Sequence, residues 1–320
     1  MNFVDGLSTR EAYGKALLTL GEQDPAIVVL DADLSRSTMT ALFAERFPER
    51  FFDTGVAEQN MVGTAAGLAT VGKVPFLSTF AVFGSGRVFD QLRMCVAYPR
   101  LNVKVAVSHS GLTVGEDGAS HQAIEDVALL RCLPGFAIVV PADDTQAAWA
   151  TNAAAEHVGP VYLRLGRPRV PRVYPQGARF RLGKAHLARP GRDVTVVANG
   201  TMLVAALEAA EGCAAAGVDV RVLDLHTVKP LDREAIVAAA RETGAIVVAE
   251  EHLLSGGTGS AVGEVLVEEC PVPTEFVALR DTYAESGKPA ELLARYGLTA
   301  TDIAAAVRRV LERKLSAGVP

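Results

Sequence analysis

The feature that most limits the possible folds is a repeated alternation of short apolar runs with helical segments. Runs rich in Val, Ile and Leu are too short for helices, and turn residues bound them. We expect strands at residues 27–30, 51–52, 74–79, 103–107, 137–140, 161–165, 194–198, 218–224, 245–249 and 276–279, with helical segments between them. Such an alternation buries both faces of a parallel sheet under helices, so the predicted class is α/β.

The length and one break in the pattern predict two domains. A chain of 320 residues is too long for one ordinary core, and residues 169–192 replace the alternation with Pro, Gly and Arg. We expect a first domain at 1–175, a linker at 176–190 and a second domain at 191–320, each a helix-covered, mostly parallel sheet.

Composition excludes several classes of function. A net charge of −6 without a basic run argues against nucleic acid as a partner. Apolar runs end well short of a membrane span, and the N-terminus lacks the pattern of a signal peptide. The 4 cysteines contain no C-x-x-C pair, which is typical of reduced thiols in a cytoplasmic protein.

Polar residues follow the expected strands with unusual regularity. Asp33, Glu58, Thr79, His109 and Arg167 each stand just after a strand. Ligands of open α/β sheets bind at the carboxyl ends of the strands. The sequence therefore predicts a functional site at this edge of the first sheet.

Glu58 occupies a strand-to-helix corner. Phe51 and Phe52 suggest a buried strand, Gly55 ends it, and a helical pattern begins at Glu58. Small residues lie on one side of that helix, at Gly63, Ala66 and Gly67. An ordinary first-turn glutamate, favoured by the helix dipole, is the simplest interpretation. A carboxylate among apolar neighbours is the functional alternative.

The segment from Ser108 to Gln122 is a glycine-rich loop containing His109, Asp117 and His121. These residues could have no role beyond ending a strand and starting a helix. They could also form a metal site with two histidines and one carboxylate. A third interpretation is hydrogen bonding to a polyhydroxylated substrate and general acid–base catalysis.

Three other features have a structural and a functional interpretation each. Phe80 and Phe83 are either core residues or a stacking surface for a flat ligand ring. Arginines and a serine at element boundaries either face solvent or bind phosphate: Arg10, Ser37 and Arg167. The S-G-G-T-G-S segment at 255–260 could bind an anion, but a tight turn into a capped helix is favoured.

Three of these segments resemble transketolase: G-V-A-E-Q-N-M (55–61), S-T-F-A-V-F (78–83) and H-S-G-L-T-V-G-E-D-G-A-S-H-Q (109–122). The resemblance covers the pyrimidine-binding and C-terminal domains, hence nearly all of this chain, as in the second subunit of a split transketolase. It implies transfer of a two-carbon ketol unit between sugar phosphates, with thiamine diphosphate as the cofactor.

The resemblance implies a role for individual positions around the cofactor. Glu58 would bond N1′ of the aminopyrimidine, and it would have to stay neutral there, which an apolar corner favours. Phe80 and Phe83 would surround the pyrimidine, and Asp33 would lie beside the cofactor. Gly86 stands where full-length transketolases usually place a tyrosine, so the expected pocket is less aromatic.

On the substrate side, the resemblance implies that Asp117 and His121 read the hydroxyl groups of the donor. A second group would grip the acceptor and its phosphate: His109, Arg10, Ser37 and Arg167. His109 and His121 join Glu58 as the expected catalytic residues.

The sequence contains no G-D-G followed by a distant asparagine, the family's site for the diphosphate and its metal. We therefore expect the cofactor to be shared with an N-terminal transketolase subunit that carries this motif and holds Mg²⁺ or Ca²⁺. The expected assembly contains two copies of each chain in the cytoplasm, with the small-residue face of the Glu58 helix at a subunit boundary.

Three alternatives remain open at this point. Deoxyxylulose-phosphate synthase shares the loop but has an arginine where Ser110 stands. The beta subunit of 2-oxo-acid dehydrogenases has the same two-domain layout but typically lacks the set of His109, Asp117 and His121. A non-catalytic regulatory subunit would have no reason to keep Glu58 and both histidines.

Overall fold

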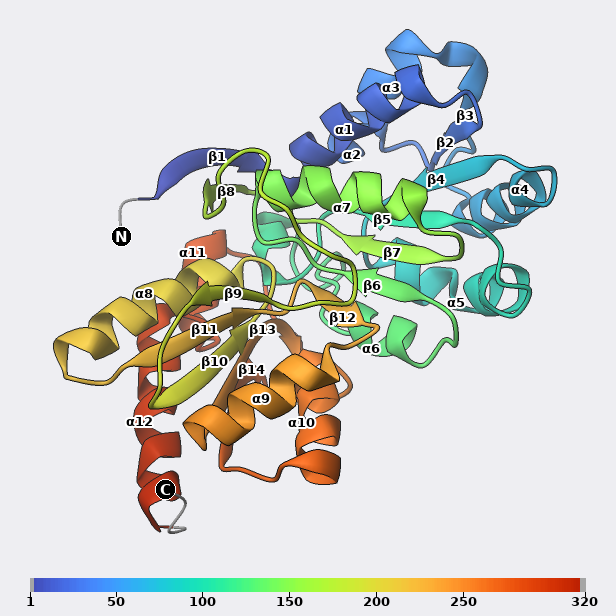
Figure 1. Ribbon diagram of the computed structural model, residues 1–320. Helices are drawn as coiled ribbons and strands as arrows, with labels where there is room; N and C mark the ends of the chain where they lie inside the picture. Colours follow the sequence, from blue (N-terminus) through green and yellow to red (C-terminus); the bar gives the residue numbers. More distant parts are fainter. Residues whose placement is uncertain (1–2, 317–320) are drawn as a thin grey trace.

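The computed structural model describes residues 3–316, which form two large sheets and one small one (Figure 1). The outermost residues of the two expected domains, 1–2 and 317–320, lie outside this range. Helices cover both large sheets, and most strand pairs within them are parallel. The predicted α/β class, with two helix-covered and mostly parallel sheets, is confirmed. Within residues 3–316, no helix is both long and apolar enough to cross a membrane.

The first large sheet has seven strands in the order β12-β6-β7-β5-β4-β2-β3. Their bounds are β2 (Ile27–Asp31), β3 (Phe51–Asp53), β4 (Val74–Ser78), β5 (Lys104–Val107), β6 (Ala137–Val139), β7 (Val161–Arg164) and β12 (Thr227–Lys229). All pairs are parallel except β12 with β6. The order places β3, β2, β4 and β5 side by side, so their carboxyl ends share one edge.

Helices cover both faces of this sheet. One face packs against α1 (Thr9–Gln23) and α7 (Asp144–Glu156), and α2 (Ser35–Thr38) and α3 (Ala41–Arg46) follow β2. The other face packs against α4 (Glu58–Thr70) and α6 (Asp126–Arg131), with α5 (Phe89–Gln91) nearby. Two of these helices begin at a local signal: Ser8 forms a capping box with Glu11, and Asp143 accepts from the Gln146 N–H.

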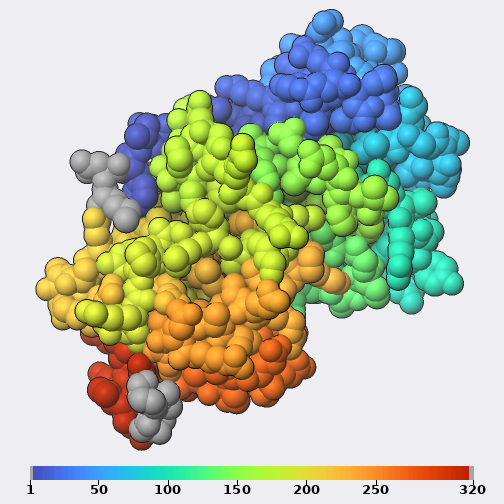
Figure 2. Space-filling view, viewed as in Figure 1, coloured from blue at the N-terminus to red at the C-terminus, as the bar shows by residue number. Residues whose placement is uncertain are grey.

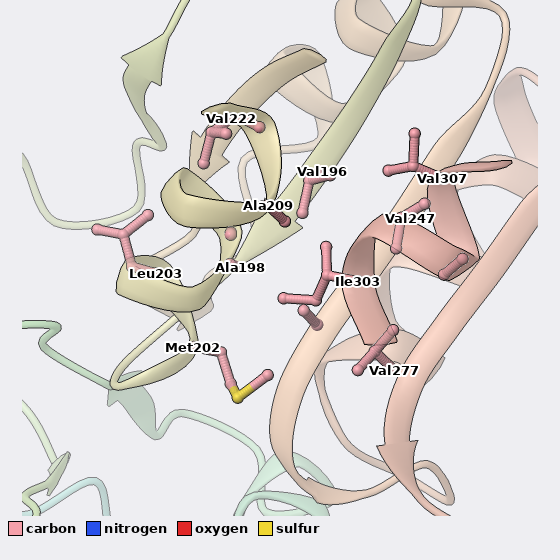
Figure 3. Packing of buried hydrophobic residues seen from close by; sticks show 14 of the residues in the cluster. Val196, Ala198, Met202, Leu203, Ala209, Val222, Val247, Val277, Ile303 and Val307 are labelled. Carbon is pink, nitrogen blue, oxygen red and sulfur yellow. The ribbon is translucent and has the colours of Figure 1, made fainter. Parts of the chain in front are cut away.

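The second large sheet has five strands in the order β14-β13-β10-β11-β9. Their bounds are β9 (His186–Arg189), β10 (Val194–Ala198), β11 (Val220–Asp224), β13 (Ile246–Leu253) and β14 (Thr274–Leu279). The covering helices are α8 (Met202–Ala215), α9 (Arg233–Thr243), α10 (Thr258–Glu269), α11 (Pro289–Arg295) and α12 (Ala300–Ser316). Figure 3 shows Leu203 and Ala209 of α8 and Ile303 of α12 on one face of the sheet, beside Val196 and Val247.

The two halves are joined more closely than a simple linker would join them. Strand β12, from the second half of the chain, extends the first sheet by pairing antiparallel with β6. Strand β8 (Arg169–Arg172) pairs with β1 (Val4–Ser8), and β9 lies within the expected linker 176–190 yet belongs to the second sheet. Figure 2 shows the connecting segment, in yellow-green, packed across the surface between the two halves. The domain boundaries themselves stay a prediction.

Three local expectations differ from the structure. Strand β3 lies at the edge of its sheet, so Phe52 is exposed and not buried. The segment 121–132, which precedes the strand expected at 137–140, is helical only at Asp126–Arg131, because the glycine-rich loop continues to residue 125. The helical segment between the strands expected at 74–79 and 103–107 is not a continuous α-helix, because π-helical turns occur at Phe83–Arg87 and Leu92–Ala97. Such turns are frequent at functional sites.

Candidate functional site

The predicted site residues follow adjacent strands of the first sheet. Glu58 starts the helix after β3, Asp33 follows β2, Phe80 follows β4 and His109 follows β5. The parallel register brings these strand ends to one edge, as the sequence predicted. Arg167 follows β7, which continues the same edge beyond β5.

Glu58 is the first residue of α4, and its side chain is only 2% exposed. Its Oε1 atom accepts a hydrogen bond of 2.8 Å from Arg87 Nη1. The Arg87 guanidinium also lies over the Phe83 ring, 4.2 Å from its centroid. The sequence suggested an apolar corner that keeps Glu58 neutral, whereas here a cation pairs with it. Arg87 was missed because it lies 29 residues further along the chain.

Phe80 and Phe83 form an aromatic cluster with both loop histidines. The Phe80 ring stacks on His109 with centroids 3.9 Å apart and lies 6.1 Å from Phe83. The His121 ring meets Phe83 edge-on at 5.4 Å and Phe80 at 6.1 Å. Phe80 is buried and Phe83 is half-buried, so Phe83 is the more accessible of the two rings. The structure thus brings together two predicted aromatic residues and two predicted histidines.

His109 is held in an unusual environment. It has a positive φ of 58° and is buried, and its Nδ1 atom lies 2.8 Å from the Ser108 hydroxyl. Burial lowers the pKa of His109 to about 3, and the positive charges of Arg10 and Arg167 act in the same direction. At neutral pH this imidazole is therefore uncharged, and it can donate or accept a hydrogen bond without carrying a proton as a cation.

Arg10, Ser37 and Arg167 come together although they are distant in sequence. Arg10 donates from Nε to the Arg167 carbonyl at 3.2 Å and from Nη1 to the Ser37 carbonyl at 2.6 Å. Burial lowers the pKa of Arg10. Arg167 in turn bonds the Val114 carbonyl and lies 3.9 Å from Asp117 Oδ1. Two guanidinium groups beside a neutral histidine form a region suited to an anionic group.

Asp33 is placed at the expected strand end but is exposed, and its φ is 62°. Its N–H bonds Asp53 Oδ1 at 3.1 Å. The buried carboxylate at this strand end is Asp31, which is not among the site residues predicted from the sequence. Burial raises the pKa of Asp31 to about 6, against hydrogen bonds from Thr38, Leu34 and Thr40. The sequence feature that could have indicated Asp31 is a carboxylate at the last position of an apolar strand.

The metal interpretation of the loop finds no support in the geometry. Over residues 3–316, no group of three or more His, Cys, Asp and Glu side chains could hold a metal ion. Asp117 instead lies near Arg167, and His121 Nδ1 lies 2.9 Å from the Ser120 hydroxyl.

The glycine-rich turn at 255–260 is a capped helix start, as favoured from the sequence. Glu250 accepts hydrogen bonds from the N–H groups of Thr258, at 2.6 Å, and Gly259, at 2.8 Å. The chain's own carboxylate therefore occupies the position that an anion would take.

Comparison with known proteins shows the family to which the chain belongs. The family model for the transketolase pyrimidine binding domain matches residues 5–172, and that for the transketolase C-terminal domain matches residues 183–303. The 6-deoxy-6-sulfo-D-fructose transketolase subunit SqwH of Clostridium sp. (strain MSTE9) is 45% identical, over 95% of each chain. Transketolase of Homo sapiens is 40% identical over 97% of this chain but only 50% of its own length.

Among solved structures, one described as a split gene transketolase, inactive beta4 tetramer, is 55% identical. It superposes with a TM-score of 0.91, over 97% of this chain and 100% of its own. Transketolase from Leishmania mexicana, at 24% identity and a TM-score of 0.82, shares the fold. The chain therefore belongs to the transketolase family, as the C-terminal subunit of a split transketolase.

Proposed function

We propose that this chain is the pyrimidine-side subunit of a two-chain, thiamine-diphosphate-dependent transketolase. The observation that carries the proposal is the buried carboxylate of Glu58, which Arg87 links to the half-buried ring of Phe83. A carboxyl group that can share a proton with a ring nitrogen and an aromatic face for the ring are the two groups that an aminopyrimidine requires. The stacked His109 and the Arg10–Arg167 pair lie at the same edge.

The cofactor's pyrimidine fits this chain, whereas its diphosphate and metal do not. Mg²⁺ and Ca²⁺ prefer several oxygen ligands, and residues 3–316 present no acidic cluster that could supply them. We therefore assign the diphosphate and the metal, Mg²⁺ or Ca²⁺, to an N-terminal partner subunit with the G-D-G…N motif. The two relatives that are subunits or halves of split enzymes support this division.

When bound, thiamine diphosphate supplies the nucleophilic carbon of ketol transfer. In this proposal N1′ of the aminopyrimidine would replace Arg87 as the partner of Glu58, which would share a proton with it, and Phe80 and Phe83 would fix the plane of that ring. Asp33 lies beside the cofactor. Asp117 and His121 bind the hydroxyl groups of the donor sugar. His109 and His121 also exchange protons with the reacting oxygens, with His109 starting from its neutral form.

The acceptor's anionic end is assigned to Arg10, Ser37 and Arg167. A sugar phosphate is the leading substrate class, because two guanidinium groups suit a dianion. A sugar sulfonate is a second candidate, since one relative is a subunit for a 6-deoxy-6-sulfo sugar. This need for an anion site argues against a 2-oxo-acid dehydrogenase. This chain has Ser110 where deoxyxylulose-phosphate synthase has an arginine in the loop, which argues against that alternative.

We propose a two-plus-two assembly in the cytoplasm, with the exposed side of α4 at a subunit boundary. The sequence placed Gly63, Ala66 and Gly67 on that side. In the structure Gly63 and Gly67 are exposed, whereas Ala66 packs into the core. A relative's structure is described as an inactive beta4 tetramer, which supports self-association of the chain without its partner.

The test combines the chain with its co-purified partner and replaces Glu58. We expect Glu58→Gln to lower ketol transfer by at least ~100-fold, typical of a proton-transfer group, with the fold unchanged. The isolated chain, given thiamine diphosphate and Mg²⁺, should show no turnover and only weak cofactor binding by calorimetry. Near-normal turnover by Glu58→Gln, or tight binding with activity in the isolated chain, would refute the proposal.

A further inference from the structure

The loop that contains Asp117 and His121 has little structure of its own. This site loop, residues 110–125, closes at its ends through a bridge between Ser110 and Ala123 and a 2.9 Å bond from the Gly111 N–H to the Ala123 carbonyl. Between these ends the segment Leu112–Asp117 forms short 3₁₀ turns on either side of a kink at Gly115, and the N–H groups of His121 and Gln122 bond the Gly118 carbonyl. These local bonds shape the individual turns, whereas the position of the whole loop also depends on the surface against which it packs.

That surface belongs to the second half of the chain, and its central residue is Glu251 of β13. The Glu251 carboxylate is buried and accepts a 2.7 Å hydrogen bond from the Thr113 N–H. Its other oxygen accepts from the Thr201 hydroxyl at 2.8 Å. Thr113 and Glu251 are 138 residues apart in the sequence, so this contact joins the two halves of the chain.

Gly111 shows how closely the carboxylate approaches the loop. A Cβ atom added at Gly111 would lie 2.3 Å from Glu251 Oε1, and the φ of this residue is +74°. No larger residue fits there without displacing Glu251. The close approach of the Glu251 carboxylate to the loop therefore requires glycine at position 111.

Arg164 connects the far end of the loop to the same strand. Its Nη2 donates to the Ala123 carbonyl at 3.0 Å and to the Glu251 carbonyl at 3.1 Å, while its Nε bonds Asp126 at 2.8 Å. Burial raises the pKa of Glu251, and the positive charge of Arg164 acts against that rise. The buried cation Arg164 therefore contacts both the loop and β13, close to the buried carboxylate of Glu251.

The opposite side of the loop contacts the segment before α11. Gln122 donates from Nε2 to the Glu285 carbonyl at 3.0 Å. A Cβ at Gly118 would meet the Ser286 hydroxyl, and one at Gly115 would meet Pro289. The second half therefore holds the loop from two directions, with Glu251 at the end nearest His109.

We propose that Glu251 is a positioning residue of the substrate site, which fixes the loop backbone at Thr113 and thereby places Asp117 and His121. The second half of the chain then helps to build the site and does more than complete the fold. What Asp117 and His121 bind rests on the proposed function, but the contact between Glu251 and the loop does not.

The first test is amide hydrogen exchange on the full chain, with two substitutions and a control. Glu251→Ala removes both acceptors, and the amide of Thr113 and its loop neighbours should exchange at least about 10-fold faster, as expected for the loss of a buried charged acceptor. Glu251→Gln keeps an acceptor for Thr113 and should restore most of the protection. Glu250→Ala is the matched control, because the neighbouring Glu250 accepts its hydrogen bonds from the N–H groups of Thr258 and Gly259, at the start of α10.

The second test measures kinetics with the partner subunit. Glu251→Ala should raise the KM for the donor sugar by about 10-fold or more, the scale of one lost charged contact, and leave cofactor affinity unchanged. Glu250→Ala should not change this KM even when it lowers stability. Equal exchange and equal KM in Glu251→Ala and Glu250→Ala would overturn the proposal. Failure of wild-type ketol transfer would count against the proposed function. The exchange experiment would still test whether Glu251 fixes the loop backbone.

Discussion

Arg87 and Glu58 form an ion pair of 2.8 Å in which the carboxylate is 2% exposed and the guanidinium 45%. A buried charge left without its partner costs more than a surface charge would, but the exposure of Arg87 weakens the pair through solvent screening. We expect a double-mutant cycle with Arg87→Ala and Glu58→Gln to give a coupling energy of about 1–2 kcal/mol in urea unfolding. A coupling energy near zero would mean that the pair contributes nothing to stability.

The environment of His109 predicts a dependence of stability on pH. The pKa of this imidazole falls from its ordinary value of 6.5 to about 3 in the folded chain. Between these values the unfolded chain binds a proton that the folded chain does not, so stability decreases as the pH falls from about 6.5 towards 3. Wild type should therefore lose about 1 kcal/mol relative to His109→Gln between pH 7.5 and 5.5.

This difference is measured by urea unfolding of both proteins at the two pH values. Other titrating groups, including Asp31 with its raised pKa, occur in both proteins and cancel in the comparison. Equal pH profiles for the two proteins would show that His109 does not titrate abnormally.

Arg167 should contribute to binding of the acceptor's anionic group. Arg167→Ala should weaken binding of phosphorylated acceptors by roughly 1.5–3 kcal/mol, the scale of a hydrogen bond to a charged group. The KM for unphosphorylated acceptors should hardly change. Arg169→Ala is the control, since the Arg169 guanidinium bonds the Gly6 carbonyl. Assays with matched phosphate and sulfonate sugars then distinguish the two substrate classes, and equal losses for charged and neutral acceptors would exclude Arg167 from the anion site.

The exposed side of α4 should be sensitive to size in the assembly but not in the single chain. A Cβ at Gly63 meets no atom within 4 Å, so Gly63→Gln should leave the fold intact. At a subunit boundary the added side chain should prevent close packing and shift the mass measured by light scattering to smaller species. Gly212→Gln on α8 is the matched control, because that glycine is equally open. Unchanged mass in Gly63→Gln would place the boundary elsewhere.

Elements that neighbouring residues specify can be predicted from the sequence. Ser8 and Asp143 start their helices through hydrogen bonds to residues three positions away. Glu58 and His109 each follow a strand of the same parallel sheet, so both must lie at its carboxyl edge. Part of the site could therefore also be predicted.

The relationships that were missed join distant residues. Arg87 reaches Glu58 across 29 residues, and Glu251 reaches Thr113 across 138. No local pattern distinguishes Arg87 from other helical arginines or Glu251 from other buried strand residues. These contacts depend on tertiary packing, which hydrophobic periodicity does not specify.

Strand β12 has a consequence for any attempt to divide the chain. It supplies the antiparallel neighbour of β6, and the Val140 N–H bonds the His226 carbonyl just before it. A fragment that stops at residue 175 would leave β6 as an open edge, with unpaired backbone groups ready to join another chain. We therefore expect such a fragment to aggregate, and the two halves to unfold together in one cooperative transition.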